Sequence, residues 1–161
     1  MPVIDVNESM SEKRTGMVRS VSAPITPRVA EEIFPTSGLL CVPGTADEEA
    51  ALPASAADVA RAIGVNQYLT HKAEDASGNE FAALDVMSIL QGGVIAVAVE
   101  DAVASGDQPY ARHTAPGAEQ VGSFRSDDDG GNAAPVPNCR YVSSTTGAGV
   151  AWLSVNLPHA A

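Results

Sequence analysis

The stretch from Val86 to Ala115 constrains the fold more than any other part of the chain. Apolar residues dominate positions 86–90, Gly92 and Gly93 interrupt the run, and a second apolar run extends over residues 94–99. Two β-branched runs joined by Gly-Gly predict either a pair of strands or one strand with a sharp bend. A third strand is expected at residues 108–113, after the turn at residues 105–107. We therefore expect this compact β unit to lie at the centre of the fold.

The composition favours an all-β fold over a helical bundle. The chain has 161 residues, which is enough for one domain with a buried core. Its 14 glycines and 11 prolines imply many turns. Aromatic residues make up only 4% of the chain, so Val, Ile, Leu and Ala must fill the core. The prediction is an all-β, jelly-roll or barrel-like single domain with at most one short helix.

Shorter segments outside the central unit add further expected elements. Strands are expected at residues 39–42, 50–53, 121–125, 139–143 and 150–155. The last two are separated by a glycine-containing turn and should form a hairpin. The one helix-like segment begins at Ser55, which is a typical N-cap residue, and Gly64 is placed to close it.

Charge divides the chain into two parts. Residues 1–28 hold four basic and three acidic residues, a net charge of +1, whereas the remaining five basic and 17 acidic residues give −12. Residues 1–20 are polar and lack a sustained period, so we expect an extended amino-terminal arm there and a β domain over residues 21–161. The overall net charge of −11 would be repelled by phosphate, which argues against nucleic acid as a partner.

The sequence indicates neither a membrane span nor a signal peptide, so we expect synthesis in the cytoplasm and no membrane partner. The two cysteines, Cys41 and Cys139, do not form a CxxC pair, so no zinc site is indicated. A disulfide between them would require strands to bring them together. The pattern favours two buried thiols, because a free cysteine behaves as a small apolar residue.

Two groups of carboxylates are candidate sites. Asp127, Asp128 and Asp129 precede two glycines, a composition that can bind Ca²⁺, but consecutive side chains in a turn diverge and no distant Glu closes an EF-hand loop. A solvated acidic turn is the preferred interpretation. Glu100 and Asp101, with Asp107, offer carboxylates for glycoside hydrolysis, but residues of a surface turn explain them better.

No other combination of residues predicts catalysis or a cofactor. His71, His113 and His159 are isolated from one another, and no GxSxG or Cys-His signature accompanies them. Gly147 and Gly149 form a lone Gly-x-Gly between two expected strands, which is a very weak nucleotide-binding signal. We therefore assign no catalytic, cofactor-binding or metal-binding residue.

Trp152 and three arginines are the remaining residues of interest. Trp152 is the only tryptophan, and the prediction favours a core position over an interface hot spot. Arg112, Arg125 and Arg140 are three of the five basic residues that follow residue 28. Each lies in or after an expected strand, and we expect them to pair with acidic loops of a neighbouring molecule.

Several ordered segments together carry a resemblance to a known family. They are GGVIAVAVEDAVASGDQPYARHTA at 92–115, GSFRSDDDGG at 122–131, and residues 38–45, 52–57, 137–141 and 150–157. Over Gly38 to Leu157, the chain resembles the structural cement (decoration) proteins of tailed-phage capsids. The resemblance rests on the order of these short segments rather than on one chemical motif.

The resemblance implies a structural protein rather than an enzyme, with no cofactor. It implies binding to the major capsid protein on the outer capsid surface of the virion, after synthesis in the cytoplasm of the bacterial host. It also implies self-association as a dimer or trimer, and bridging of neighbouring shell subunits. The alternative is a small carbohydrate-binding or hydrolytic β domain that uses the acidic turns, although few aromatic residues are present for sugar stacking.

Overall fold

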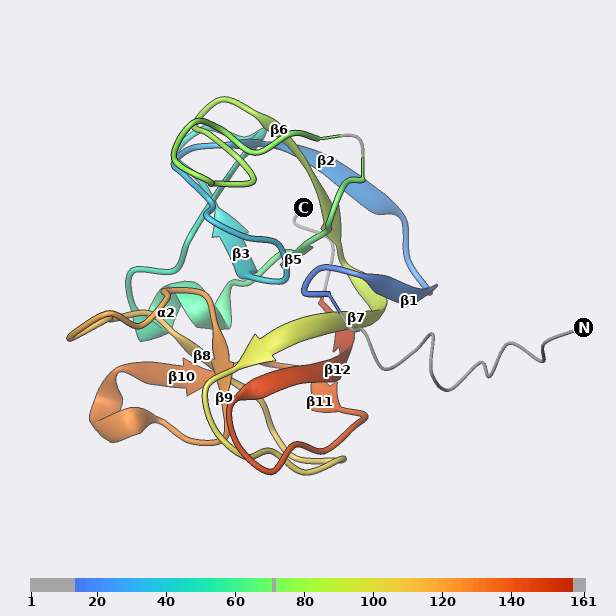
Figure 1. Ribbon diagram of the computed structural model, residues 1–161, viewed down its shortest axis with the longest axis vertical. Helices are drawn as coiled ribbons and strands as arrows, with labels where there is room; N and C mark the ends of the chain where they lie inside the picture. Colours follow the sequence, from blue (N-terminus) through green and yellow to red (C-terminus); the bar gives the residue numbers. More distant parts are fainter. Residues whose placement is uncertain (1–13, 71, 158–161) are drawn as a thin grey trace, which may run out of the picture.

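The computed structural model describes residues 14–70 and 72–157, which are almost entirely β-stranded (Figure 1). The elements are β1 (Val18–Val21), β2 (Ile25–Ala30), β3 (Leu40–Pro43), β4 (Glu49–Ala51), α2 (Ala56–Ala60), β5 (Gly64–Asn66), β6 (Val86–Leu90), β7 (Gly92–Val99), β8 (Tyr110–Arg112), β9 (Phe124–Arg125), η1 (Asp129–Gly131), β10 (Ala133–Pro135), β11 (Arg140–Tyr141) and β12 (Gly149–Asn156). α2 is the only α-helix among the described residues. The prediction of an all-β, barrel-containing fold with at most one short helix is confirmed for them.

The strands form a closed barrel and a separate sheet. The barrel has the order β2-β4-β3-β5-β6, and the sheet has the order β10-β8-β9-β7-β12-β11, with β1 paired to β7 as well. In Figure 1 the barrel lies in the upper half of the view and the sheet in the lower half. β7 and β12 pair antiparallel along their full length, from Gly92 opposite Asn156 to Val99 opposite Gly149. The predicted hairpin at the end of the chain is confirmed by the pairing of β11 with β12.

Gln91 lies where the chain passes from the barrel to the sheet. β6 is a barrel strand and β7 is a sheet strand, so the Gly-Gly dipeptide follows a sharp bend in one extended segment. Of the two alternatives for this stretch, the pair of hydrogen-bonded strands is wrong. Gln91 is buried, and its Oε1 accepts a 2.9 Å hydrogen bond from Thr26 Oγ1. A buried amide needs such a partner, and this one ties β2 to the bend.

The barrel strands β3 and β5, together with the last two residues of β6, are buried on both faces and separate two hydrophobic cores. Consecutive residues of one strand enter different cores: Ile89 packs inside the barrel, whereas Leu90 packs against the sheet. Leu39 and Leu40 divide in the same way. Strands buried on both faces have continuous apolar runs instead of an alternating pattern. This burial accounts for the unbroken apolar sequence of residues 39–42.

The two cysteines lie in different cores. Cys41 packs inside the barrel and Cys139 packs with the sheet, and both are buried, free thiols. The wall of the barrel therefore separates them, and the interpretation as two buried thiols is confirmed. Burial raises the pKa of both thiols, that of Cys139 to about 11, so both stay protonated at neutral pH.

The predicted helix is present but shorter than expected. Ser55 is its N-cap, and Ser55 Oγ accepts a hydrogen bond of 3.2 Å from the Asp58 backbone N–H. The helix ends at Ala60 with Arg61 as C-cap, so the prediction that Gly64 closes it is wrong. Gly64 begins β5, where a Cβ would collide with the Ile89 side chain. No helix among the described residues has the length and apolar character needed to cross a membrane.

Residues 14–21, most of which fall in the predicted arm, pack onto the body of the protein. The Arg14 guanidinium lies 4.0 Å from the centre of the Tyr68 ring and 3.3 Å from Glu80 Oε1. The Gly16 backbone N–H donates a 2.7 Å hydrogen bond to the Ala96 carbonyl oxygen of β7, and β1 then pairs with β7. The rest of the predicted arm, residues 1–13, lies outside the described residues.

Candidate functional site

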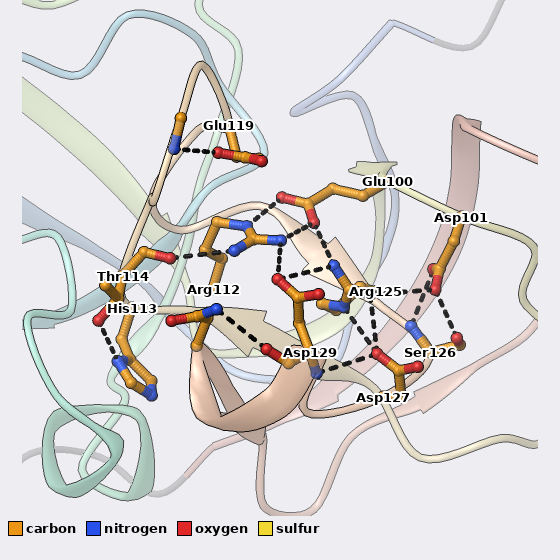
Figure 2. A network of polar contacts seen from close by, with 12 residues as sticks. Glu100, Asp101, Arg112, His113, Thr114, Glu119, Arg125, Ser126, Asp127 and Asp129 are labelled. Carbon is orange, nitrogen blue, oxygen red and sulfur yellow. Dashed lines mark hydrogen bonds and ion pairs between the residues drawn. The ribbon is translucent and has the colours of Figure 1, made fainter.

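Arg112 is the centre of a network of ion pairs at one end of the sheet (Figure 2). Its side chain is only 2% exposed. Nε and Nη2 each donate a hydrogen bond of 2.7 Å to the two carboxylate oxygens of Glu100, which is the bidentate geometry that an Arg–carboxylate pair favours. Nη2 also donates to Asp129 Oδ2 at 2.8 Å, and Nη1 donates to the Thr114 carbonyl oxygen at 3.0 Å.

Arg125 extends this network toward a second group of carboxylates. Its Nη1 donates to Glu100 Oε2 and its Nε donates to Asp127 Oδ1, both at 2.9 Å. Nη2 lies 3.7 Å from Asp101 Oδ2, and the same carboxylate of Asp101 accepts hydrogen bonds from the backbone N–H and the hydroxyl of Ser126. Glu100 therefore lies between two arginines, as Figure 2 shows.

Strand pairing explains why residues far apart in sequence meet here. β9 lies between β8 and β7, so Arg112 at the end of β8, Arg125 on β9 and Glu100 just after β7 are neighbours. Asp129 is brought in by the short helix η1, in which Asp129 and Gly130 both have left-handed backbone conformations. The network therefore joins three strand ends and one loop.

The network is suited to bracing loops and not to acid catalysis. The hydrogen bond from Arg112 holds the pKa of Asp129 below its ordinary value of 3.8. A general acid at neutral pH needs a carboxyl group whose pKa is raised, so the shift of Asp129 is in the opposite direction. Glu100 and Asp127 also accept hydrogen bonds from arginine.

Comparison with known proteins identifies the family. The sequence matches the family model "Structural cement protein (E217 gp24/Pam3 gp6)" over residues 6–156. The chain belongs to the structural cement protein family. No curated protein matches the sequence significantly. A chain of the solved structure "The capsid of Myoviridae Phage XM1" matches with a TM-score of 0.65 and 19% identity, covering 89% of each chain, a likeness that concerns the fold.

The acidic turn of this cement protein lies at the surface, as the sequence favoured, with the Asp127 side chain 64% exposed, but arginines hold two of its carboxylates. Asp127 and Asp129 are ion-paired with arginines, and only Asp128, which precedes η1, has a side chain that stays exposed without an ion pair among the described residues. Within residues 14–70 and 72–157, no group of three or more His, Cys, Asp or Glu side chains is arranged to hold a metal ion. The interpretation as surface turn residues holds for the exposed Asp107 but not for Glu100, whose side chain is only 19% exposed.

The histidines and glycines that the sequence singled out do not converge. His113 Nδ1 lies 2.9 Å from the Thr114 hydroxyl, whereas His71 and His159 lie outside the described residues. Asp107, the third carboxylate considered for glycoside hydrolysis, contacts β11 through its backbone: its carbonyl oxygen accepts a hydrogen bond from the Tyr141 N–H. Gly147 lies in the connection from β11 to β12, and Gly149 begins β12.

The expectation that the arginines of the cement protein pair with a neighbouring molecule is wrong for two of them. Arg112 and Arg125 are held by carboxylates of their own chain. Arg140 Nη1 donates to Gln108 Oε1 at 2.6 Å.

The core position of Trp152 is confirmed, because the residue is only 6% exposed. Sequence reasoning missed the network because the parallel contact between β7 and β9, which brings Glu100 to the arginines, leaves no local pattern.

The acidic carboxyl groups of the cement protein predict a loss of stability at low pH. The folded state lowers the pKa of Asp129 through Arg112, of Asp58 through Arg61 and of Asp85 through Lys72, each from an ordinary value of 3.8. Since the unfolded chain binds these protons more tightly, stability is fully present above their ordinary pKa and is lost as the pH falls through the lower folded values. Thermal melts should therefore show a constant Tm from about pH 5 to 8 and a fall below about pH 4.

The Asp129→Asn variant provides the control for this fall of the Tm at acid pH, which we call the acid limb of the Tm–pH curve. It removes one of the responsible carboxylates, so its Tm should start lower at neutral pH and fall less steeply in acid. A Tm that rises below pH 4, or an acid limb of equal slope in the variant, would contradict the assignment.

Proposed function

We propose that this cement protein binds the outer surface of a phage head and bridges neighbouring major capsid protein subunits, without catalysing a reaction. The observation that carries the proposal is the family match over residues 6–156, which covers both the barrel and the sheet. The shared fold with a chain from the capsid of a myovirus, phage XM1, supports it.

The proposed mechanism is multivalent. Each copy, or a dimer or trimer of copies, engages several shell subunits, so that contacts of modest strength combine through a high effective concentration. Such a bridge opposes separation of the subunits when packaged DNA presses on the shell. The net charge of −11 suits an outward position, away from the DNA, and makes nucleic acid an unsuitable partner.

The amino-terminal arm is proposed to add contacts along the shell. The charge of the arm supports this role, because residues 1–20 hold three basic and three acidic residues, whereas residues 21–161 carry a net charge of −11. Residues 18–20 belong to β1, so a deletion that tests the arm should spare them. Removing residues 2–13 leaves Arg14 and β1 in place.

Undecorated shells of the parent phage provide the test. Added full-length protein should bind them saturably and raise the temperature at which they rupture by several degrees, measured by release of an encapsulated dye. The chain without residues 2–13 should melt at the same temperature as the full chain but bind about tenfold more weakly, a loss of about 1.4 kcal/mol. Shells that rupture at the same temperature with and without bound protein would rule out the bridging role.

A further inference from the structure

The outer face of the β2–β6 pair is apolar where a barrel exterior is expected to be polar. Met87 and Ile89 of β6 point into the barrel core and are fully buried, so Val86 and Ser88 point outward. Antiparallel pairing places Val29 opposite Val86, and Pro27 opposite Ser88, on the same outer face. Outward positions of an antiparallel strand usually carry polar side chains. We call this surface the β2–β6 face, and its apolar members are Ile25, Pro27, Val29, Leu84 and Val86.

Four of the five members of the β2–β6 face are exposed, Val29 is half-buried, and part of the face is hollow. Val86 is 59% exposed and Ile25 is 39% exposed. Pro27, Val29 and Val86 line an open hollow of about 410 Å³, together with Thr26, Arg28 and Glu48. Hollows lined by apolar side chains are where interface anchors bury most of their surface.

Leu84, at the turn that leads into β6, makes the strongest case for an external partner. Its φ of 72° is left-handed, a conformation that is costly for a bulky L-residue, yet its side chain is 77% exposed. The turn itself is fixed by other groups, because the Leu84 backbone N–H donates to the Ala30 carbonyl at 2.7 Å and Asp85 Oδ2 accepts from the Ala82 N–H at 2.8 Å. A glycine would meet these backbone requirements with less strain, so the leucine side chain gains little within this chain.

The charges around the β2–β6 face decide which partner fits it. Glu48 lines the hollow, and its carboxylate makes no hydrogen bond or ion pair with the described residues. The exposed Asp47 precedes it. The one cation of the hollow, Arg28, already donates from Nη1 to the Asp47 carbonyl oxygen. A second copy of this chain would bring the same acidic edge against itself, which costs affinity. A segment with apolar side chains flanked by lysine or arginine complements both the hollow and its edge.

We infer that the β2–β6 face is the surface that docks onto the shell, and that it receives an apolar segment of the major capsid protein flanked by basic residues. This inference rests on the proposed function and adds to it the face that is used and the chemistry of the partner. Glu48 supplies the electrostatic contact, whereas Leu84 and Val86 supply the apolar one.

Substitutions that remove apolar area without adding charge test the inference. The double variant Leu84→Gly/Val86→Ser should bind undecorated shells at least tenfold more weakly than the unmodified protein. Leu84→Gly alone should keep or raise the Tm, because it relieves the left-handed strain, while it still weakens binding. The matched control is Val142→Ser, at a valine that is 40% exposed beside β11, and its affinity should stay within twofold.

A charge reversal separates the possible partners. Glu48→Lys should weaken shell binding, because like charges then meet at the edge of the hollow. Added salt should lessen the difference between this variant and the unmodified protein.

Sedimentation of the free protein should be the same for all four variants. Loss of self-association in the double variant would instead assign the face to a second copy and overturn the inference. Tight binding of the double variant to shells that the unmodified protein also binds would overturn it while leaving the proposed function intact. Failure of the unmodified protein to bind shells would overturn both.

Discussion

Replacing Arg112 with alanine should lower the free energy of unfolding by about 3 kcal/mol. The Arg112 side chain is 2% exposed, and its guanidinium satisfies Glu100, Asp129 and the Thr114 carbonyl oxygen at once. Truncation leaves Glu100 with Arg125 as its remaining cation and leaves a cavity where the guanidinium lay. Breaking one side of a buried pair is far more costly than breaking an exposed one, because the other charge stays desolvated.

Urea denaturation monitored by the fluorescence of Trp152 measures this loss. The matched control is Arg61→Ala, which removes an arginine whose side chain is 65% exposed and which pairs with Asp58 at 2.8 Å. An exposed pair of this kind contributes less than about 1 kcal/mol. If Arg112→Ala and Arg61→Ala were equally destabilising, the network would not be the brace that its geometry indicates.

Replacing Gly93 with alanine should displace β1 from β7 and cost about 3 kcal/mol of stability. Gly93 has a φ of 139°, and a Cβ at this position would collide with the carbonyl oxygen of Ser20 on β1. Ser20 and Val21 pair with Val94 and Gly93, so the collision falls within the contact that fixes residues 18–21. The neighbour is backbone and cannot rotate away, so the strand itself must move.

Limited proteolysis with Edman sequencing should detect this displacement directly. In the Gly93→Ala variant, trypsin should cleave after Arg19 much faster than in the unmodified chain. Gly147→Ala is the matched control, since no atom lies within 4 Å of the Cβ it would add. Equal cleavage rates in Gly93→Ala and the unmodified chain would show that β1 tolerates the added methyl group.

Local patterns were sufficient to predict the elements of this fold that depend on neighbouring residues. The Ser55 cap and the strands at residues 86–99 follow from capping chemistry and β-branched runs, which act over a few residues. The bend at Gln91 stayed ambiguous because Gly-Gly is compatible with a hairpin and with a kink. Only the different partners of β6 and β7 distinguish them.

Long-range pairing accounts for what the sequence did not reveal. The Arg112–Glu100 pair depends on β9 lying between β8 and β7, and the separation of Cys41 from Cys139 depends on the barrel wall. Residues 18–20 of β1 were expected to belong to an extended arm because residues 1–20 are polar and lack a sustained period, yet β1 pairs with β7. Backbone pairing of this kind leaves little trace in side-chain composition.

Cryo-electron microscopy of purified virions of the parent phage tests the bridging role most directly. The account predicts density for this chain on the outside of the head, with each copy or small oligomer touching at least two different major capsid protein subunits and the β2–β6 face turned toward the shell. Density inside the shell, or a chain that touches a single subunit, would contradict it.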